Sequence, residues 1–223
     1  MTRVLVIDYG IGNLGNVVRA FRRLGAEVRL QEQPEDLEWA EKIVLPGVGA
    51  FGDGMAGLAA RGWIEPLKRA VVAGIPLLGI CLGMQLLFEE SEEMGCHPGL
   101  GLLRGRVRRF PPEAGKVPQI GWNRLEHTGS HPLLHGVPDG AYVYFVHGYY
   151  CEPEDPADGI ATTVYGIRYA SMVARGPVMG VQFHPEKSHR VGEQILRNFL
   201  SLRGRGAVHE WGTNTRMDGG GRL

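Results

Sequence analysis

The sequence has few cysteines, no long apolar run and no excess of either charge. Its three cysteines, Cys81, Cys96 and Cys151, are too few to hold a disulfide scaffold together. No apolar run approaches the roughly 20 residues of a membrane-spanning helix, and the opening stretch MTRVLVIDYG lacks an export-signal pattern. Basic and acidic residues both number 24, so nothing in the composition indicates a surface for nucleic acid or anionic membranes. We therefore expect a cytoplasmic protein that binds neither.

Apolar runs alternate with helical patterns in the first half of the chain. Runs typical of buried strands cover residues 4–7, 42–45 and 75–80, and helical spacing covers residues 14–24 and 63–73. This alternation predicts an α/β fold, doubly wound, with a mostly parallel central sheet and helices on both faces. In the second half, apolar runs such as AYVYFVHGYY follow one another with few helices between them. They predict an added antiparallel strand region.

The end of the chain changes in composition. Residues 191–202 carry the apolar spacing of an amphipathic helix, and the stretch after them is polar and glycine-rich. We therefore expect one domain over residues 1–203 and a flexible tail over residues 204–223.

A single cysteine follows a predicted strand and precedes a helical pattern. Gly79-Ile80-Cys81-Leu82-Gly83 has the form G-x-nucleophile-x-G, which is typical of the sharp strand-to-helix turn called a nucleophile elbow. Glycines suit that turn because larger side chains beside the nucleophile would collide. By itself the pattern leaves two interpretations open, a reactive Cys81 or a buried structural cysteine.

His184 and Glu186 provide the groups that a thiol nucleophile needs. His184 lies at the end of an apolar run in GVQFHPEKS, and Glu186 follows it across Pro185. Proline fixes the local backbone, so the carboxylate can turn back toward the imidazole and orient it. Cys81, His184 and Glu186 are thus a candidate triad, although a histidine at a strand end can also be purely structural.

Several stretches together resemble a known enzyme family. GICLGMQLLF and, further along, GVQFHPEKS resemble the class I, triad-type glutamine amidotransferases. DYGIGNLGN, LPGVGAFGDGM, VPQIGWN and YFVHGYY narrow the resemblance to the glutaminase subunits of imidazole glycerol phosphate synthase, an enzyme of histidine biosynthesis. The resemblance covers about residues 3–202 and implies a flavodoxin-like fold.

For catalysis the resemblance implies hydrolysis of L-glutamine to glutamate and ammonia. Cys81 would form a glutamyl thioester, His184 would move the protons, and Glu186 would hold the imidazole in the right tautomer. Backbone N–H groups of Val48 and Leu82 would form the oxyanion hole, where one donor is worth about 3 kcal/mol of barrier. The glycines around Val48 would let a peptide flip and complete the hole only when a partner is loaded.

The resemblance also assigns residues that bind the amino-acid part of glutamine. These are Gly49, Gln85, Glu93, His147, Gly148 and Tyr149. Gly148 departs from the family pattern, which has serine or threonine after the histidine of YFVH. A hydroxyl contact with the substrate is therefore missing, and only the backbone N–H of Gly148 remains.

The same resemblance implies a partner. Ammonia would pass to a (β/α)8-barrel cyclase subunit, in a heterodimer, which makes imidazole glycerol phosphate and AICAR from PRFAR. The residues that would face this cyclase are Asn13, Asn16, Trp122, Tyr144 and Lys187. No cofactor and no metal are implied.

Three other functions are weighed against this one. A stand-alone γ-glutamyl cysteine hydrolase would use the same triad but has no need of the partner-facing set. An inactive regulatory module has no need of an intact triad. A nicotinamide-dependent enzyme is indicated by G-x-G-x-x-G at residues 10–15 with Glu32 downstream, but the amidotransferase resemblance accounts for the same stretch.

Two further patterns are interpreted as structural. His131 and His135 have the spacing of zinc ligands on a helix, but nearby prolines predict a turn and no third ligand is evident. Arg104, Arg106 and Arg108 alternate, which predicts one face of a solvated or partner-facing edge strand rather than a phosphate site.

Overall fold

The fold is a central sheet flanked by helices, seen in a computed structural model that describes residues 1–202. Within these residues the sheet has eleven strands in the order β2-β1-β3-β4-β13-β12-β10-β7-β5-β6, with β11 paired to β12. The parallel part consists of β2 (Glu27–Gln31), β1 (Arg3–Ile7), β3 (Lys42–Gly47), β4 (Leu77–Cys81) and β13 (Val178–Val181). The predicted mostly parallel, doubly wound sheet is confirmed.

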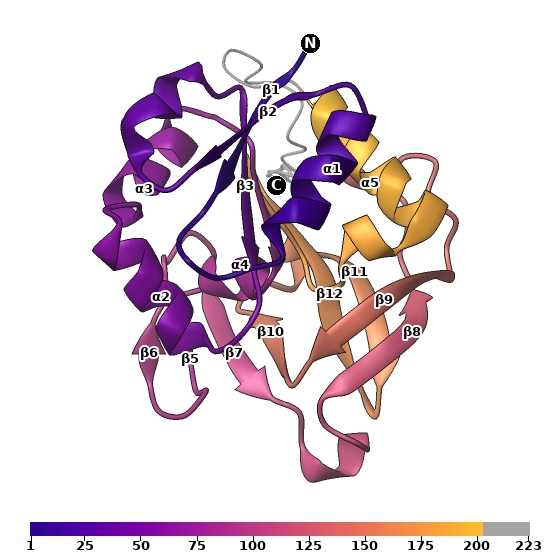
Figure 1. The fold of residues 1–223 in the computed structure, drawn as a ribbon. Helices are drawn as coiled ribbons and strands as arrows, with labels where there is room; N and C mark the ends of the chain where they lie inside the picture. Colours follow the sequence, from indigo (N-terminus) through magenta and orange to yellow (C-terminus); the bar gives the residue numbers. More distant parts are fainter. Residues whose placement is uncertain (203–223) are drawn as a thin grey trace, which may run out of the picture.

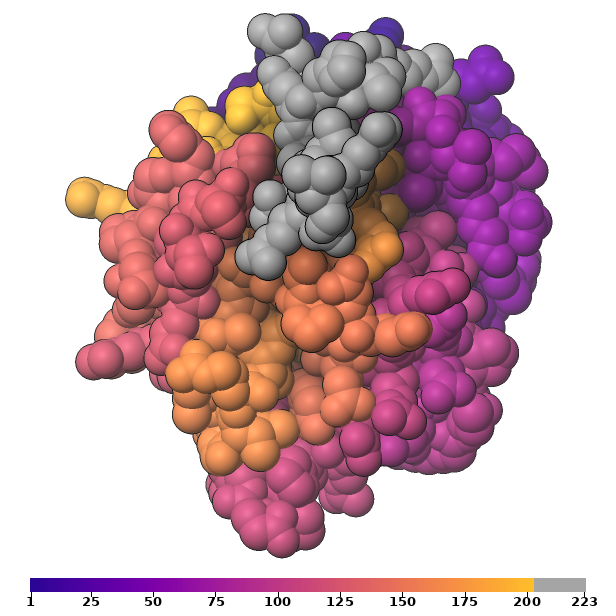
Figure 2. All heavy atoms as spheres, turned by 180° about the vertical axis from the view of Figure 1, so that it is seen from behind, coloured from indigo at the N-terminus to yellow at the C-terminus, as the bar shows by residue number. Residues whose placement is uncertain are grey.

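The second half of the chain extends this sheet with short or antiparallel strands. These are β12 (Ile167–Arg175), β11 (Gly159–Tyr165), β10 (Tyr149–Pro153), β7 (Gly105–Arg109), β5 (Glu90–Ser91) and β6 (His97–Pro98). A separate antiparallel hairpin pairs β8 (Gln119–Leu125) with β9 (Ala141–His147). Seen from behind, the surface of this half adjoins that of the first half, pink to orange against purple (Figure 2). The predicted antiparallel addition is therefore confirmed.

Two helices cover each face of the parallel strands (Figure 1). One pair is α1 (Leu14–Arg23) and α5 (His189–Ser201), and the other is α2 (Phe51–Ala60) and α3 (Ile64–Val72). A short helix, α4 (Leu82–Leu86), follows β4 directly. Short 3-10 segments lie at η1 (Pro34–Trp39), η2 (Pro112–Ala114), η3 (Pro132–Leu134), η4 (Pro156–Asp158) and η5 (Pro185–Lys187).

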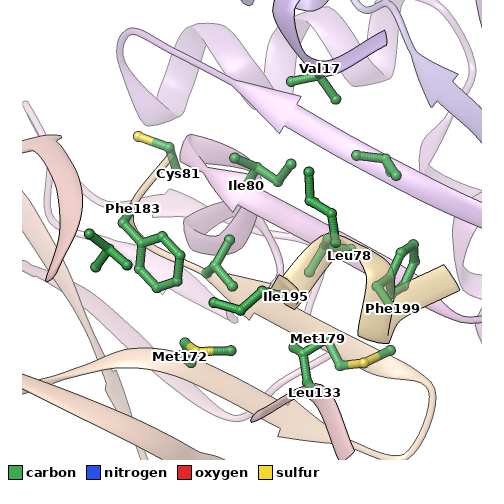
Figure 3. Close-up of a cluster of buried hydrophobic side chains, with 14 of the residues drawn as sticks. Val17, Leu78, Ile80, Cys81, Leu133, Met172, Met179, Phe183, Ile195 and Phe199 are labelled. Carbon is green, nitrogen blue, oxygen red and sulfur yellow. The ribbon is translucent and has the colours of Figure 1, made fainter. Parts of the chain in front are cut away.

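Alternation along each strand divides the core into two layers. Leu78 and Ile80 of β4 point toward α1 and α5, where Phe199 packs (Figure 3), while Leu77 belongs to the layer under α2 and α3. Burying a large apolar side chain contributes about 1.5–3 kcal/mol. This two-sided burial is why the parallel strands are apolar throughout instead of alternating in polarity.

Neither β2 nor α2 was predicted from the sequence, and the position of one strand in the sheet was predicted wrongly. β2 has a single buried residue, Val28, so it lacks the apolar run of the other parallel strands. The glycine-rich α2 covers residues that were not assigned to any element from the sequence. The arginine strand β7 is not at an edge, because β10 and β5 pair with it on either side, and Arg106 and Arg108 both lie against Glu152.

Each of the two predicted helices is followed by a glycine. Gly25 and Gly74, which come directly after residues 14–24 and 63–73, have φ of +85° and +77°. Only glycine adopts these values readily, so each glycine turns the chain out of its helix. No helix in residues 1–202 is long and apolar enough to cross a bilayer. The predicted tail, residues 204–223, lies outside the described residues.

Candidate active site

Cys81 lies in the sharp turn between β4 and α4. Its backbone has φ 55° and ψ −113°, a conformation that costs a non-glycine residue of the order of 1–3 kcal/mol. Its sulfur lies at the margin of the apolar cluster, away from Ile80 (Figure 3). Strain of this kind persists only where the surroundings impose it.

The two glycines of the elbow impose this turn by close packing. A Cβ on Gly83 would lie 1.7 Å from the carbonyl oxygen of Leu45, and a Cβ on Gly79 would lie 2.5 Å from the carbonyl oxygen of Gly83. Neither contact is possible for a side chain. The glycines therefore let β3, β4 and α4 approach closely enough to hold Cys81 in its strained conformation.

His184 and Glu186 lie beside this turn because β13 runs parallel to β4. Val181 is in register with Ile80, so the residues after β13 emerge next to Cys81. The turn η5 then brings Glu186 back toward the ring, with its Oε1 2.9 Å from His184 Nδ1. Their side chains are only 2% and 4% exposed, so water does not screen the pair.

The protonation of His184 depends on these neighbours. Burial alone would lower its pKa, but the interactions with Cys81 and Glu186 outweigh burial and raise the pKa to about 9. The Nε2 atom of His184 is buried and has no partner at hydrogen-bond geometry within residues 1–202. The ring is thus held by Glu186 on one nitrogen and free on the other to exchange a proton with Cys81.

The Cys81 thiol has two further contacts. It lies 3.9 Å from the carbonyl oxygen of Val146, and the side-chain amide of Gln182 donates to it at 3.8 Å. Gln182 is fully buried and also accepts a hydrogen bond from Gln85 Nε2 at 3.1 Å. The sequence analysis missed Gln182, although a polar residue inside the apolar run before His184 is a usable signal.

The expected oxyanion donors lie on either side of Cys81. Gly47 at the end of β3 is in register with Cys81, so Val48 follows at the same edge, and Leu82 begins α4. Gly47 packs against α4, since a Cβ there would lie 3.0 Å from Leu82 Cβ. Gly49 has φ +101°, so a glycine stands on each side of Val48, and this short segment can turn.

Two of the expected glutamine-binding side chains have partners inside the protein. Gln85 Nε2 donates to the carbonyl oxygen of Tyr149 at 3.2 Å as well as to Gln182. Glu93 accepts a hydrogen bond of 2.8 Å from the backbone N–H of Phe51, which caps the start of α2. Both side chains are therefore held in place by partners inside the protein.

Both ring nitrogens of His147 have partners inside the protein and are not available to a ligand. Its Nδ1 lies 2.7 Å from the carbonyl oxygen of Tyr149 and its Nε2 3.2 Å from the Tyr169 hydroxyl. Burial lowers its pKa to about 4, so the ring is neutral at physiological pH. A substrate contact from this segment must come from the backbone of residues 147–149 and from Tyr149, which is partly exposed.

Gly148 is not required by the fold. A Cβ at this position would lie 3.4 Å from Val117 Cγ1, an ordinary van der Waals contact, and its φ is not positive. A serine or threonine would fit here, so the glycine only removes a hydroxyl.

Comparison with known proteins places this geometry in a family. Residues 5–202 match the model of "Glutamine amidotransferase class-I". The "Imidazole glycerol phosphate synthase subunit HisH" of Symbiobacterium thermophilum is 49% identical over 199 residues, which cover 89% of this chain and 93% of that protein. The HisH subunit of Geobacillus kaustophilus is 51% identical over 202 residues, or 88% of this chain and 95% of that protein. The chain belongs to the HisH family of class I glutamine amidotransferases.

Solved structures agree on the fold of this HisH family member. PurLQS from Thermotoga maritima superposes with a TM-score of 0.73 at 22% identity, covering 89% of this chain and 97% of that chain. A structure described as a glutamine amidotransferase gives a TM-score of 0.70 at 22% identity and covers 88% and 96%. At this identity the likeness concerns the fold alone.

Three of the residues expected to face a partner lie together on the surface. Trp122 of β8 packs edge-on against Tyr144 of β9 with 6.0 Å between ring centroids, and Lys187 Nζ lies 5.7 Å from the centroid of the Tyr144 ring. His189, which the sequence analysis missed, stacks on Trp122 at 5.0 Å. Trp122 is 46% exposed, an unusual state for so large an apolar side chain.

The other two members of that set, Asn13 and Asn16, lie at the start of α1. Asn13 is exposed and makes no capping hydrogen bond with its side chain, while Asn16 Oδ1 accepts a hydrogen bond from Arg19. α1 packs against η5, which carries Lys187. Both groups of residues are therefore on elements that adjoin the triad.

The patterns interpreted as structural can now be placed. His131 begins η3, where its Nδ1 accepts a hydrogen bond of 3.1 Å from the N–H of Leu133, so the predicted turn is confirmed. Within residues 1–202 no three His, Cys, Asp or Glu side chains are grouped as metal ligands.

Proposed function

We propose that this chain hydrolyses L-glutamine to glutamate and ammonia at Cys81 and passes the ammonia to a (β/α)8-barrel cyclase subunit. In that heterodimer the cyclase makes imidazole glycerol phosphate and AICAR from PRFAR. The observation that carries the proposal is the buried His184–Glu186 pair beside a cysteine on a strained elbow, in a chain of the HisH family. The catalytic unit is residues 1–203, and its setting is the cytoplasm, where thiols stay reduced.

The reaction begins with attack of Cys81 Sγ on the side-chain carbonyl carbon of glutamine. His184 takes the thiol proton, and the carbonyl electron pair moves onto the oxygen, which the N–H groups of Val48 and Leu82 stabilise. The C–N bond then breaks, and His184 gives its proton to the departing nitrogen. Ammonia leaves and a glutamyl thioester remains on Cys81.

Hydrolysis of the thioester reverses the proton path. His184 takes a proton from water, the hydroxide adds to the thioester carbon, and the C–S bond breaks to release glutamate. Glu186 holds Nδ1–H throughout, so that Nε2 is the atom that exchanges protons. Gly49, Gln85, Glu93 and residues 147–149 hold the amino and carboxylate groups of glutamine.

The cyclase docks on the surface formed by Trp122, Tyr144, Lys187, Asn13 and Asn16. Lys187 is next to Glu186 in sequence, and α1 with its two asparagines packs on the same turn η5. Docking at this surface therefore presses on η5, the turn that carries Glu186 of the triad. This is the feature that a stand-alone γ-glutamyl hydrolase would not need.

The test is glutamate formation by the chain with and without the cyclase subunit and PRFAR. We expect slow hydrolysis by the chain alone and an acceleration of about 10²–10³-fold in turnover, the scale of one oxyanion donor. Cys81→Ser is expected to abolish hydrolysis while synthesis from ammonium salts survives, and Cys96→Ser is the matched control because Cys96 is exposed. Hydrolysis by Cys81→Ser would refute the assignment of the nucleophile, and full-rate turnover without the cyclase would favour the stand-alone hydrolase.

A further inference from the structure

Tyr9 carries a buried hydroxyl that lacks a hydrogen-bond partner in residues 1–202. The residue follows β1 and is 1% exposed. An unpaired buried polar group is costly, and a phenylalanine of the same shape would avoid that cost. A tyrosine at this position therefore needs a reason beyond packing.

The hydroxyl lies against the backbone of the predicted oxyanion strand. A Cβ on Gly47 would lie 2.2 Å from the Tyr9 oxygen, so the hydroxyl is in the space that a side chain on Gly47 would fill. Gly47 is also in register with Cys81. Tyr9 is thus within reach of the peptide that joins Gly47 to Val48. Burial, and after it the charge of Cys81, raises the pKa of the Tyr9 phenol, so it stays protonated and can act as a donor.

The tyrosine itself has no freedom to find another partner. Its ring belongs to the core layer under α2 and α3, and its carbonyl oxygen accepts a hydrogen bond of 2.8 Å from Arg61. A Cβ on Gly57 would lie 2.5 Å from that same oxygen, so α2 closes over it. Of the Tyr9 side chain and the Gly47–Val48 peptide, the peptide is therefore the one that can move, because a glycine lies on each side of Val48.

We propose that Tyr9 is a positioning residue whose hydroxyl donates a hydrogen bond to the carbonyl oxygen of Gly47. The bond forms when the Gly47–Val48 peptide turns the Val48 N–H toward the oxyanion. This inference rests on the proposed glutaminase reaction. The Tyr9 hydroxyl is then a hydrogen-bond donor already in place for the turned Gly47–Val48 peptide. The hydroxyl is unpaired in the structure because the peptide has not turned.

The neighbouring loop connects this peptide to the predicted cyclase surface. A Cβ on Gly49 would lie 3.8 Å from Ile11 Cγ2, and a Cβ on Gly12 would lie 3.9 Å from the Gly47 Cα. Residues 11 and 12 therefore pack on the segment that must turn, and Asn13, which faces the cyclase in our proposal, follows them directly. A cyclase that binds at Asn13 can therefore displace residues 11 and 12 and, through them, turn the Gly47–Val48 peptide toward the Tyr9 hydroxyl.

The experiment compares Tyr9→Phe with the parent chain, each in complex with the cyclase and PRFAR. Removing the donor leaves the turned carbonyl buried and unpaired, so we expect kcat for glutamine to fall about 5- to 100-fold with KM within about twofold. Inhibition by a glutamine analogue with an aldehyde in place of the amide should weaken by a similar factor, because its adduct with Cys81 carries the same oxyanion. The affinity for glutamate should not change.

Thermal unfolding separates this role from a structural one. Because its hydroxyl is unpaired in the resting structure, Tyr9→Phe is expected to unfold at the same temperature as the parent or higher. The matched control is Tyr165→Phe, which removes a hydroxyl that donates to the carbonyl oxygen of Lys116 at 2.6 Å and should leave kcat unchanged.

Each other outcome is decisive. A parent complex that does not hydrolyse glutamine would refute the proposed function, and this inference with it. An active parent with unchanged kcat in Tyr9→Phe would refute the role of Tyr9 and leave the function standing. A lower unfolding temperature together with a raised KM would show that Tyr9 only supports the fold.

Discussion

Replacing Glu186 by glutamine tests how the carboxylate controls the proton on His184. Glutamine keeps an oxygen that can accept the 2.9 Å hydrogen bond from Nδ1 and keeps the volume, but it removes the negative charge. Burial by itself lowers the pKa of His184, and Glu186 is one of the two groups that oppose it. We therefore expect the pKa of His184 in Glu186→Gln to fall below its parental value of about 9.

The effect on stability follows from linkage between protonation and folding. The imidazole has a pKa of about 6.5 in the unfolded chain and about 9 in the folded one. This difference corresponds to about 3 kcal/mol of unfolding free energy, to which Glu186 and Cys81 both contribute. Because the folded pKa is the higher one, this stabilisation is complete below about pH 6.5 and is lost as the pH rises through about 9.

The contribution of Glu186 to the unfolding free energy is measured by denaturant unfolding of the parent and of Glu186→Gln, at about pH 6 and again at about pH 10. We expect the variant to be less stable by about 1–2 kcal/mol at the lower pH and by less than half of that at the higher pH. Glu193→Gln is the control, since its carboxylate pairs with Arg197 on the exposed face of α5. A stability gap that is equal at both pH values, or larger at the higher one, would refute the reasoning.

Two more predictions concern the partner surface and the elbow. Lys187→Ala should lower the ratio of cyclase-stimulated to unstimulated glutamate formation, because the lysine adjoins Glu186 and packs over Tyr144; an unchanged ratio would exclude it from the coupling. Gly83→Ala should destabilise the fold by about 3 kcal/mol or more, since its Cβ would lie 1.7 Å from the backbone oxygen of Leu45. A variant that unfolds at the parental temperature would contradict that close contact.

The parts of the fold that are predictable from sequence are those that depend on local pattern. β1, β3 and β4 are apolar runs because both of their faces are covered, and α1 ends at a glycine with positive φ. α2 is not predictable in this way, because glycines interrupt its pattern and its first N–H is capped by Glu93, which lies 42 residues away. A contact over that distance leaves no periodic signal.

The same distinction applies to the site. Cys81 could be singled out because an elbow requires glycines at fixed spacing, and Glu186 because it lies only two residues after His184. Gln182 leaves only the weak signal of a polar residue inside an apolar run, and Tyr9 leaves none, because neither has a fixed spacing from its partner in the sequence. Gln182, for example, meets Cys81 across 101 residues. Only the register of the sheet brings such pairs together.

That register also determines which part of the site is able to move. The proposed nucleophile, its proposed base and the proposed oxyanion strand all lie at the carboxyl ends of adjacent parallel strands, with Gly47 paired to Cys81 and Ile80 to Val181. Ladder hydrogen bonds fix these pairs, and slipping by one residue would turn every buried side chain to the wrong face. Val48 and Gly49 lie just beyond the last pair of β3 and are free of that constraint. We therefore expect a partner that controls the reaction without unfolding the sheet to act on this segment, which has Ile11 beside Gly49 at one end and Tyr9 beside Gly47 at the other.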